Sequence, residues 1–111
     1  SYEKMKKYTM AIQYYRKARS VDPAFSESWY GLANLMHNQG HYYEAVYYIR
    51  KALSLRKAHP DFLFLAGEIF ESLEFYEDAI SYIEDLVKLD PEDDEATSFL
   101  ESLKKKYNES I

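Results

Sequence analysis

The chain repeats its own residue pattern every 34 positions. Ala11, Ala45 and Ala79 occupy equivalent places, and each follows a tyrosine by three residues. A fixed period of this length is typical of stacked helical units, because each unit buries its apolar face only against its neighbours. The repeat therefore predicts an all-α array that presents a surface, and it favours binding over catalysis.

Apolar residues within each repeat recur at the spacing of an amphipathic helix. Trp29, Leu32 and Met36 make one stripe, and Leu63 and Phe70 belong to the equivalent stripe one repeat later. Connections of two to five residues make successive helices antiparallel neighbours. The expected helices span residues 7–20, 25–38, 42–55, 60–72, 76–89 and 92–107.

Proline and small residues mark where the helices begin and where they cross. Asp22-Pro23 and Asp90-Pro91 each place a capping carboxylate before a proline of the first helical turn, and Pro60 opens another helix. Gly67 lies inside an expected helix, at a cost of about 1 kcal/mol relative to alanine. Together with Ala45, it indicates helices that cross at close range.

These segments resemble the tetratricopeptide repeat (TPR), a 34-residue helix–turn–helix family. The second unit carries the pattern at Trp29, Leu32 and Ala33, and then at Ala45 and Ala52. The resemblance implies a right-handed superhelical α-solenoid of antiparallel helix pairs. Its expected parts are a partial first repeat at 1–25, a second repeat at 26–59, a third repeat at 60–93 and a capping helix at 94–111.

The resemblance also implies a concave groove that is lined by the first helix of each pair and receives a protein or peptide. Asparagine can donate to and accept from a peptide amide, and aromatic rings offer rigid apolar area. The alternative is that these positions are simply solvated helix faces. The expected groove residues are Tyr30, Asn34, His37, Asn38, Phe64, Glu68 and Glu71.

One subfamily of these repeats grips a C-terminal carboxylate with groove lysines, arginines and asparagines. Asn34 matches one of those asparagines. Aromatic, acidic or apolar residues occupy other clamp positions, and Glu68 and Glu71 would repel a carboxylate. This sequence therefore disfavours a carboxylate clamp. The residues at those other clamp positions are Tyr30, Asp61, Phe64 and Leu65.

Two sets of apolar residues predict self-association. Tyr43 and Tyr47 lie four residues apart on an outer helix face, where polar residues are usual; scattered tyrosines that carry no function are the alternative. The second set would normally pack against a preceding helix that this chain largely lacks. We expect a homodimer through the first helix, formed by Met5, Tyr8, Ile12 and Tyr15.

Charge is divided unevenly along the chain. Residues 1–57 carry ten lysines and arginines against four acids, whereas residues 58–111 carry four lysines against fifteen acids. Nucleic-acid binding by the basic half is the alternative function, but its cations lie on outer helices and the expected groove is acidic. A regulatory appendage of an enzyme encoded elsewhere in a longer chain is a further alternative. The cations in question are Arg16, Lys17, Arg19, Arg50, Lys51 and Arg56.

Other functional classes find little support in the sequence. There is no cysteine and no run of about 18 apolar residues, so neither a thiolate site nor a membrane span is expected. His37 and His41 are four residues apart, but Gly40 places a turn between them, so we expect no metal site. We also expect no cofactor and no catalysis, a cytoplasmic location, and a chain that is a fragment of a longer protein.

Overall fold

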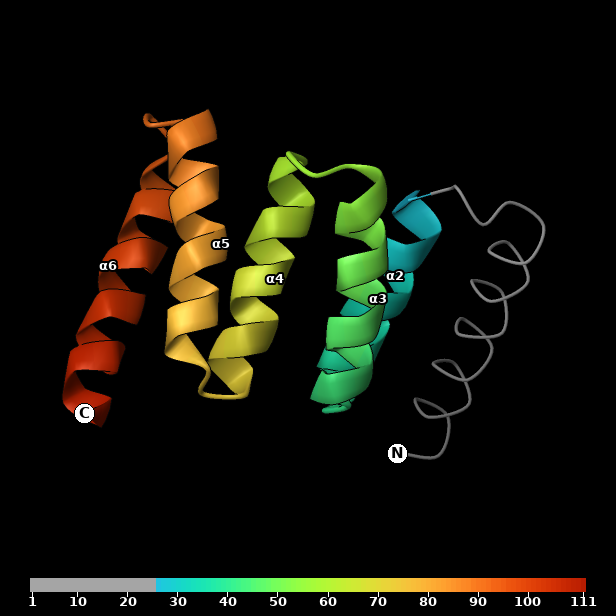
Figure 1. Cartoon of the computed structure of the whole chain (residues 1–111), viewed down its shortest axis with the longest axis horizontal. Helices are drawn as coiled ribbons and strands as arrows, with labels where there is room; N and C mark the ends of the chain where they lie inside the picture. The colour runs from blue at the N-terminus through green and yellow to red at the C-terminus, as the bar shows by residue number, and fades with distance from the viewer. Residues whose placement is uncertain (1–25) are drawn as a thin grey trace. The chain divides into compact units, whose positions relative to one another are not determined.

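The computed structural model describes residues 26–111, which form five α-helices (Figure 1). The predicted all-α fold of sequential antiparallel pairs is confirmed, whereas the superhelical winding and the repeat boundaries remain predictions. The first predicted helix lies outside the described residues, as does Asp22-Pro23, the predicted cap of the second helix. The helices are α2 (Ser26–Asn38), α3 (Tyr42–Leu55), α4 (Pro60–Ser72), α5 (Tyr76–Leu89) and α6 (Asp94–Ser110).

The chain divides into two compact units, Ser1–Lys57 and Ala58–Ile111. In the first, α2 and α3 pack antiparallel and join through a tight turn (Figure 1). Gly40 has a φ of 84°, a left-handed conformation that glycine adopts without strain. The turn lets the backbone N–H of His41 donate to the carbonyl of Met36 at 2.8 Å. The buried apolar residues of the pair are Trp29, Leu32, Ala33, Met36, Ala45, Tyr48, Ile49, Ala52 and Leu53.

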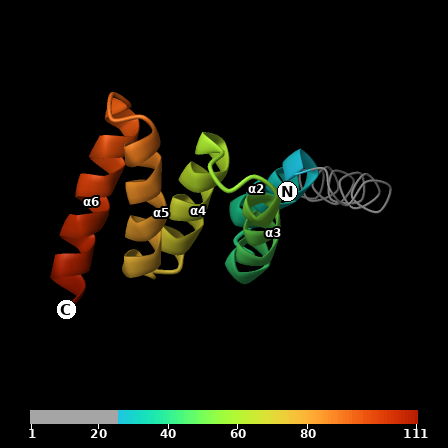
Figure 2. The ribbon, with the colours of Figure 1, turned by 45° about the horizontal axis from the view of Figure 1, so that its top comes forward.

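The second unit is a row of three helices, with α5 between α4 and α6 (Figures 1 and 2). α4 buries a wider stripe than the sequence pattern indicates, because Phe62 and Leu65 are buried beside the expected residues. The placement of Leu65 at a clamp position of the groove is therefore wrong. The buried apolar residues of this unit are Phe62, Leu63, Leu65, Ala66, Ile69, Phe70, Ala79, Ile83, Leu86, Ala96 and Leu103.

Gly67 lies where α4 packs closely against α5. A Cβ atom at this position would lie 2.6 Å from Cγ1 of Ile83 and 3.2 Å from the ring of Phe99 on α6. Real Cβ atoms do not approach a methylene carbon at 2.6 Å, so alanine would already require a shift. The prediction that Gly67 permits close helix packing is confirmed.

The predicted cap of the last helix is wrong. We expected a helix at 92–107 capped by Asp90, with Pro91 in its first turn, but α6 begins at Asp94 and runs to Ser110. The carboxylate of Asp93 accepts from the backbone N–H of Ala96 at 3.2 Å, which caps the helix. Asp90 instead accepts from the N–H of Glu92 within the preceding turn.

The start of α4 agrees with the expectation. The helix begins at Pro60, whose missing N–H has no helical partner at this position in any case. His59 occupies the cap position but makes no side-chain capping hydrogen bond. Its ring stacks on Phe62 instead, with the two centroids 4.0 Å apart.

Replacing Gly67 with leucine is expected to destabilise the fold. The larger side chain would overpack the crossing with Ile83, at a cost of about 1–3 kcal/mol or more. Thermal unfolding followed by circular dichroism measures the change. Ser81→Leu, at an exposed position of α5, is the matched control and should change stability by less than about 0.5 kcal/mol. A Gly67→Leu protein that melts within a degree of the wild type would show that the crossing is not tightly packed.

Candidate partner-binding surfaces

One face of α2 carries the first four predicted groove residues. Tyr30, Asn34 and His37 are spaced by four and three residues, so they share a face, and Asn38 follows on the next turn. Both asparagines are exposed, whereas Tyr30 and His37 are half-buried. The ring of His37 lies 5.5 Å from that of Tyr42 on α3, a contact that fixes its orientation. This face therefore offers amide groups beside aromatic and imidazole rings.

The three predicted groove residues of α4 also share a face, but two of them, Phe64 and Glu71, contact α6. Phe64 packs against Phe99 with their ring centroids 5.2 Å apart. Glu71 accepts a hydrogen bond from the ammonium group of Lys106 at 2.7 Å. The partners lie 35 residues apart, so no local spacing in the sequence indicates the pair.

Acidic groups determine the electrostatics of this α4 face. Partial burial raises the pKa of Glu68 above its ordinary value, and the nearby carboxylates of Glu71 and Glu95 raise it further. The hydrogen bond to Glu71 raises the pKa of Lys106, because it stabilises the charged ammonium group. Three acids and one lysine leave the face negative at neutral pH. It can attract a cation and repels a carboxylate.

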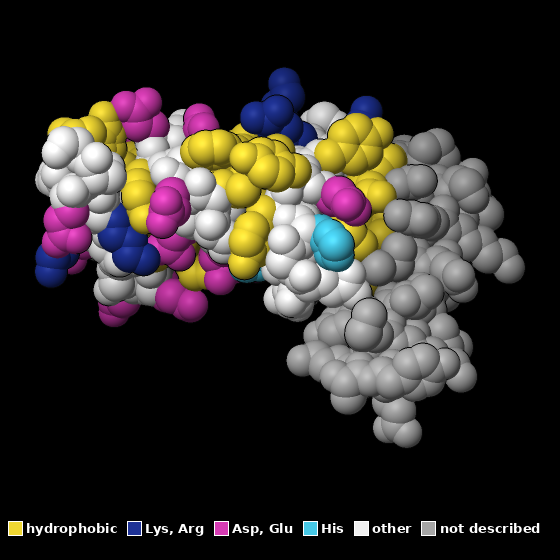
Figure 3. All heavy atoms as spheres, turned by 90° about the horizontal axis from the view of Figure 1, so that it is seen from below, with side chains coloured by type: hydrophobic (Ala, Val, Ile, Leu, Met, Phe, Trp, Pro, Cys, Tyr) yellow, Lys and Arg dark blue, Asp and Glu magenta, His cyan; other side chains and the backbone are white. Residues whose placement is uncertain are grey.

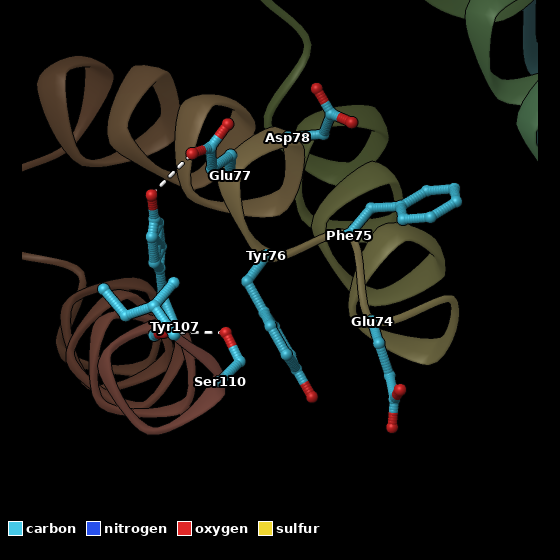
Figure 4. Close-up of a pocket in the computed structure, with 8 residues that line it drawn as sticks. Glu74, Phe75, Tyr76, Glu77, Asp78, Tyr107 and Ser110 are labelled. Carbon is cyan, nitrogen blue, oxygen red and sulfur yellow. Dashed lines mark hydrogen bonds between the residues drawn. The ribbon is translucent and has the colours of Figure 1, made fainter.

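A cavity of about 270 Å³ lies where the start of α5 meets the end of α6 (Figure 4). Tyr107 donates a hydrogen bond to Glu77, which raises the pKa of this tyrosine. Ser110 donates to the carbonyl of Tyr107 at 2.7 Å. In Figure 4, Phe75 and Asp78 point away from Tyr107. The three acids that line the cavity, Glu74, Glu77 and Asp78, do not point towards a common position. We therefore assign the cavity no binding role. The hydrogen bond from Tyr107 to Glu77 holds the end of α6 against the start of α5.

The outer face of α3 carries exposed tyrosines. Tyr43 is 72% exposed and Tyr47 is 54% exposed, which confirms the predicted exposure. Tyr47 is not an isolated surface residue. The centroid of its ring lies 6.3 Å from that of Trp29 and 5.3 Å from that of Tyr48. The predicted self-association remains a prediction, and its residues Met5, Tyr8, Ile12 and Tyr15 lie outside the described residues.

Two further structural findings concern metals and membranes. Among residues 26–111, no three His, Cys, Asp or Glu side chains gather as a group that could hold a metal ion. His41 lies 3.9 Å from Glu44, its neighbour on the same turn. None of the helices in this described range is long and apolar enough to cross a membrane.

Comparison with known proteins identifies the family. The family model described as "Anaphase-promoting complex, cyclosome, subunit 3" matches residues 4–86. The chain belongs to this TPR family. No curated protein sequence matches it significantly.

Solved TPR domains share the fold of this TPR chain. The first TPR of Spaghetti (RPAP3), bound to the HSP90 peptide SRMEEVD, matches with a TM-score of 0.87 and 23% identity, over 96% of this chain and 85% of that one. The Sgt2 TPR domain of Aspergillus fumigatus matches with a TM-score of 0.85 and 21% identity, over 97% of this chain and 73% of that one. A third match is the Yersinia enterocolitica type III secretion chaperone SycD, in complex with a peptide of the translocator YopD. Its TM-score is 0.81 and its identity 21%, over 95% of this chain and 86% of that one.

The raised pKa of Glu68 predicts how a variant responds to pH. Because the folded state holds the proton more tightly, Glu68 costs stability as the pH rises above its ordinary value of 4.5, and this cost is absent at lower pH. Glu68→Gln removes the charge. The difference in melting temperature, variant minus wild type, should therefore increase from pH 4 to pH 7.

Glu101→Gln, at an exposed position of α6, is the control for the loss of one negative charge in the same unit. Melting curves of the three proteins at both pH values make the comparison. An equal difference at pH 4 and pH 7 for Glu68→Gln would contradict the burial of this carboxyl group.

Proposed function

We propose that this TPR domain is a non-catalytic protein–protein interaction module, an adaptor or scaffold segment of a larger protein. It binds a peptide or a partner helix on the first-helix faces, through the predicted groove residues. The observation that carries the proposal is the α2 face, where Asn34 and Asn38 are exposed beside half-buried rings and contribute nothing to the core. RPAP3 and SycD, which share the fold, each hold a peptide, and this supports the same use here.

The chemistry of the two faces limits the kind of segment that is bound. Asn34 offers both a donor and an acceptor, which suits the backbone of an extended or helical segment whatever its side chains. Glu68 and Glu71 favour a neutral or basic segment over an acidic C-terminus. We therefore propose that this domain does not share the preference for an acidic tail that the peptide SRMEEVD would require.

Replacing Asn34 with alanine is expected to weaken partner binding without loss of stability. The side chain is exposed, so its removal takes away a hydrogen-bonding group and no core contact, and the affinity should fall about 5-fold or more. Pull-down from lysate followed by mass spectrometry identifies partners, and calorimetry with an identified partner gives the affinity. Ser102→Ala, an exposed position on α6, is the control. Unchanged affinity in Asn34→Ala and Tyr30→Ala alike would move the site away from this face.

A peptide comparison tests the preference of the acidic α4 face. The peptide SRMEEVD is expected to bind more weakly than an amidated counterpart in which lysine replaces both glutamates and the final aspartate. Glu68→Gln should narrow this difference, because it removes one of the carboxylates that the basic peptide meets. Fluorescence anisotropy at low and physiological salt measures both affinities. Tighter binding of SRMEEVD that Asn34→Ala weakens would identify a carboxylate clamp on the first-helix faces and contradict the proposed preference.

The remaining predictions from the sequence belong to the same proposal. The domain is proposed to be cytoplasmic and to form a homodimer through its first helix. Sedimentation velocity over a range of protein concentrations tests the second point. A strict monomer at high concentration, in low and high salt alike, would exclude the homodimer.

A further inference from the structure

The outer face of α3 combines exposed aromatic side chains with positive charge. A shallow hollow of about 470 Å³ runs along this face, lined by one continuous strip of side chains. Each member has another member three or four residues away, as Tyr47 has Tyr43 and Arg50, so the set follows a single side of the helix. We call this the α3 strip. Its residues are Tyr43, Val46, Tyr47, Arg50, Lys51 and Ser54.

Tyr47 is held in place by the core beneath it. Its ring meets Trp29 edge-on, at an interplanar angle of 73°, and meets Tyr48 at 74°. Trp29 and Tyr48 are each only 8% exposed, so they form a fixed support. A ring that is already ordered loses little conformational entropy when a partner covers it. Tyr47 therefore has the properties of an anchor for a binding partner.

The two cations of the α3 strip lie next to this aromatic half. The ammonium group of Lys51 lies 5.6 Å from the centroid of the Tyr47 ring, a cation–π distance. Arg50 is exposed at the neighbouring position and presents a guanidinium group, which suits a carboxylate. Among residues 26–111, no acid lines the hollow. Ordered along α3, the strip is aromatic at its N-terminal end and positive towards its C-terminal end.

Charge complementarity identifies the partner that fits. We propose that the α3 strip is a second interaction surface, which binds an acidic linear segment of another protein carrying an apolar side chain beside its carboxylates. The apolar side chain covers Tyr43 and Tyr47, and the carboxylates pair with Arg50 and Lys51. From Tyr43 to Ser54 the helix rises about 16 Å, which an extended segment of about five residues spans. This surface is distinct from the first-helix faces, which favour neutral or basic segments.

A protein segment fits the α3 strip better than a nucleic acid does. Binding to a nucleic acid depends on the number of phosphates neutralised, and two adjacent cations neutralise few. The acids of the chain add repulsion, because residues 58–111 carry a formal charge of −11. Figure 3 shows Asp and Glu side chains on the face that it draws. A short acidic peptide needs only two charge pairs and one apolar contact.

The test is selection from a displayed library of random nine-residue peptides on the full chain. Peptides that combine Asp or Glu with an aromatic or aliphatic residue should be enriched. The double variant Arg50→Glu/Lys51→Glu should lower the affinity of an enriched peptide at least about 10-fold in fluorescence anisotropy. Lys104→Glu/Lys105→Glu changes the net charge equally on exposed positions of α6, and it should leave the affinity within about 2-fold.

Further variants separate this surface from the others. Tyr43→Ala should weaken the same peptide, whereas Asn34→Ala should not, so failure of the first-helix site and failure of the α3 strip give different results. Melting curves establish that each variant is folded. The proposal is overturned if no acidic peptide is enriched or if both charge reversals weaken binding equally. Binding of single-stranded RNA that only Arg50→Glu/Lys51→Glu abolishes would replace the peptide with a nucleic acid. Loss of self-association in that variant alone would replace it with a second copy of the chain.

Discussion

Close crossing of helices at small residues is the constraint on which the rest of the structure depends. Ala33 and Ala45 in the first unit, and Ala79 in the second, have no exposed surface, and Gly67 leaves no room for a Cβ atom. Where side chains are this small, helix axes approach closely and the larger residues interdigitate on either side. Each helix can then bury a single stripe and leave its remaining faces to differ in composition. That freedom produces a neutral amide-bearing face on α2, an acidic face on α4 and an aromatic, basic strip on α3.

α6 ends the described helices with polar contacts as well as apolar ones. Phe99 packs against Phe64 of α4. Lys106 donates a hydrogen bond to Glu71, in the last turn of α4. Tyr107 donates one to Glu77, in the first turn of α5. These pairs are exposed, so each adds little free energy, but together they fix how α6 lies on its neighbours. Part of the acidity of α4 thereby serves the contact with α6.

The sequence predicts the helices closely because the 34-residue period repeats both the apolar stripes and the turns. It also predicts the close packing at Gly67, because a glycine inside a helix costs stability unless it permits a close contact. It misplaces the start of α6, because Asp90 and Asp93 are both capping residues and only the geometry of the turn decides between them. It cannot predict that Lys106 binds Glu71, because that pair depends on the tertiary contact of two helices. The sequence alone also does not establish the groove residues as a binding site, because a partner surface is defined by the molecule that covers it.

Shared architecture does not imply a shared ligand, and the charges of this chain make the point in detail. This chain matches the RPAP3 domain with a TM-score of 0.87 at 23% identity, so the fold is kept although most aligned residues differ. Specificity is a difference between affinities, and repulsion contributes to it as much as attraction. Glu68 and Glu71 would exclude an acidic segment from α4, whereas Arg50 and Lys51 would attract one to α3. The two proposed surfaces would thereby direct partners of opposite charge to different helices of one small array, without any change to the packing of those helices.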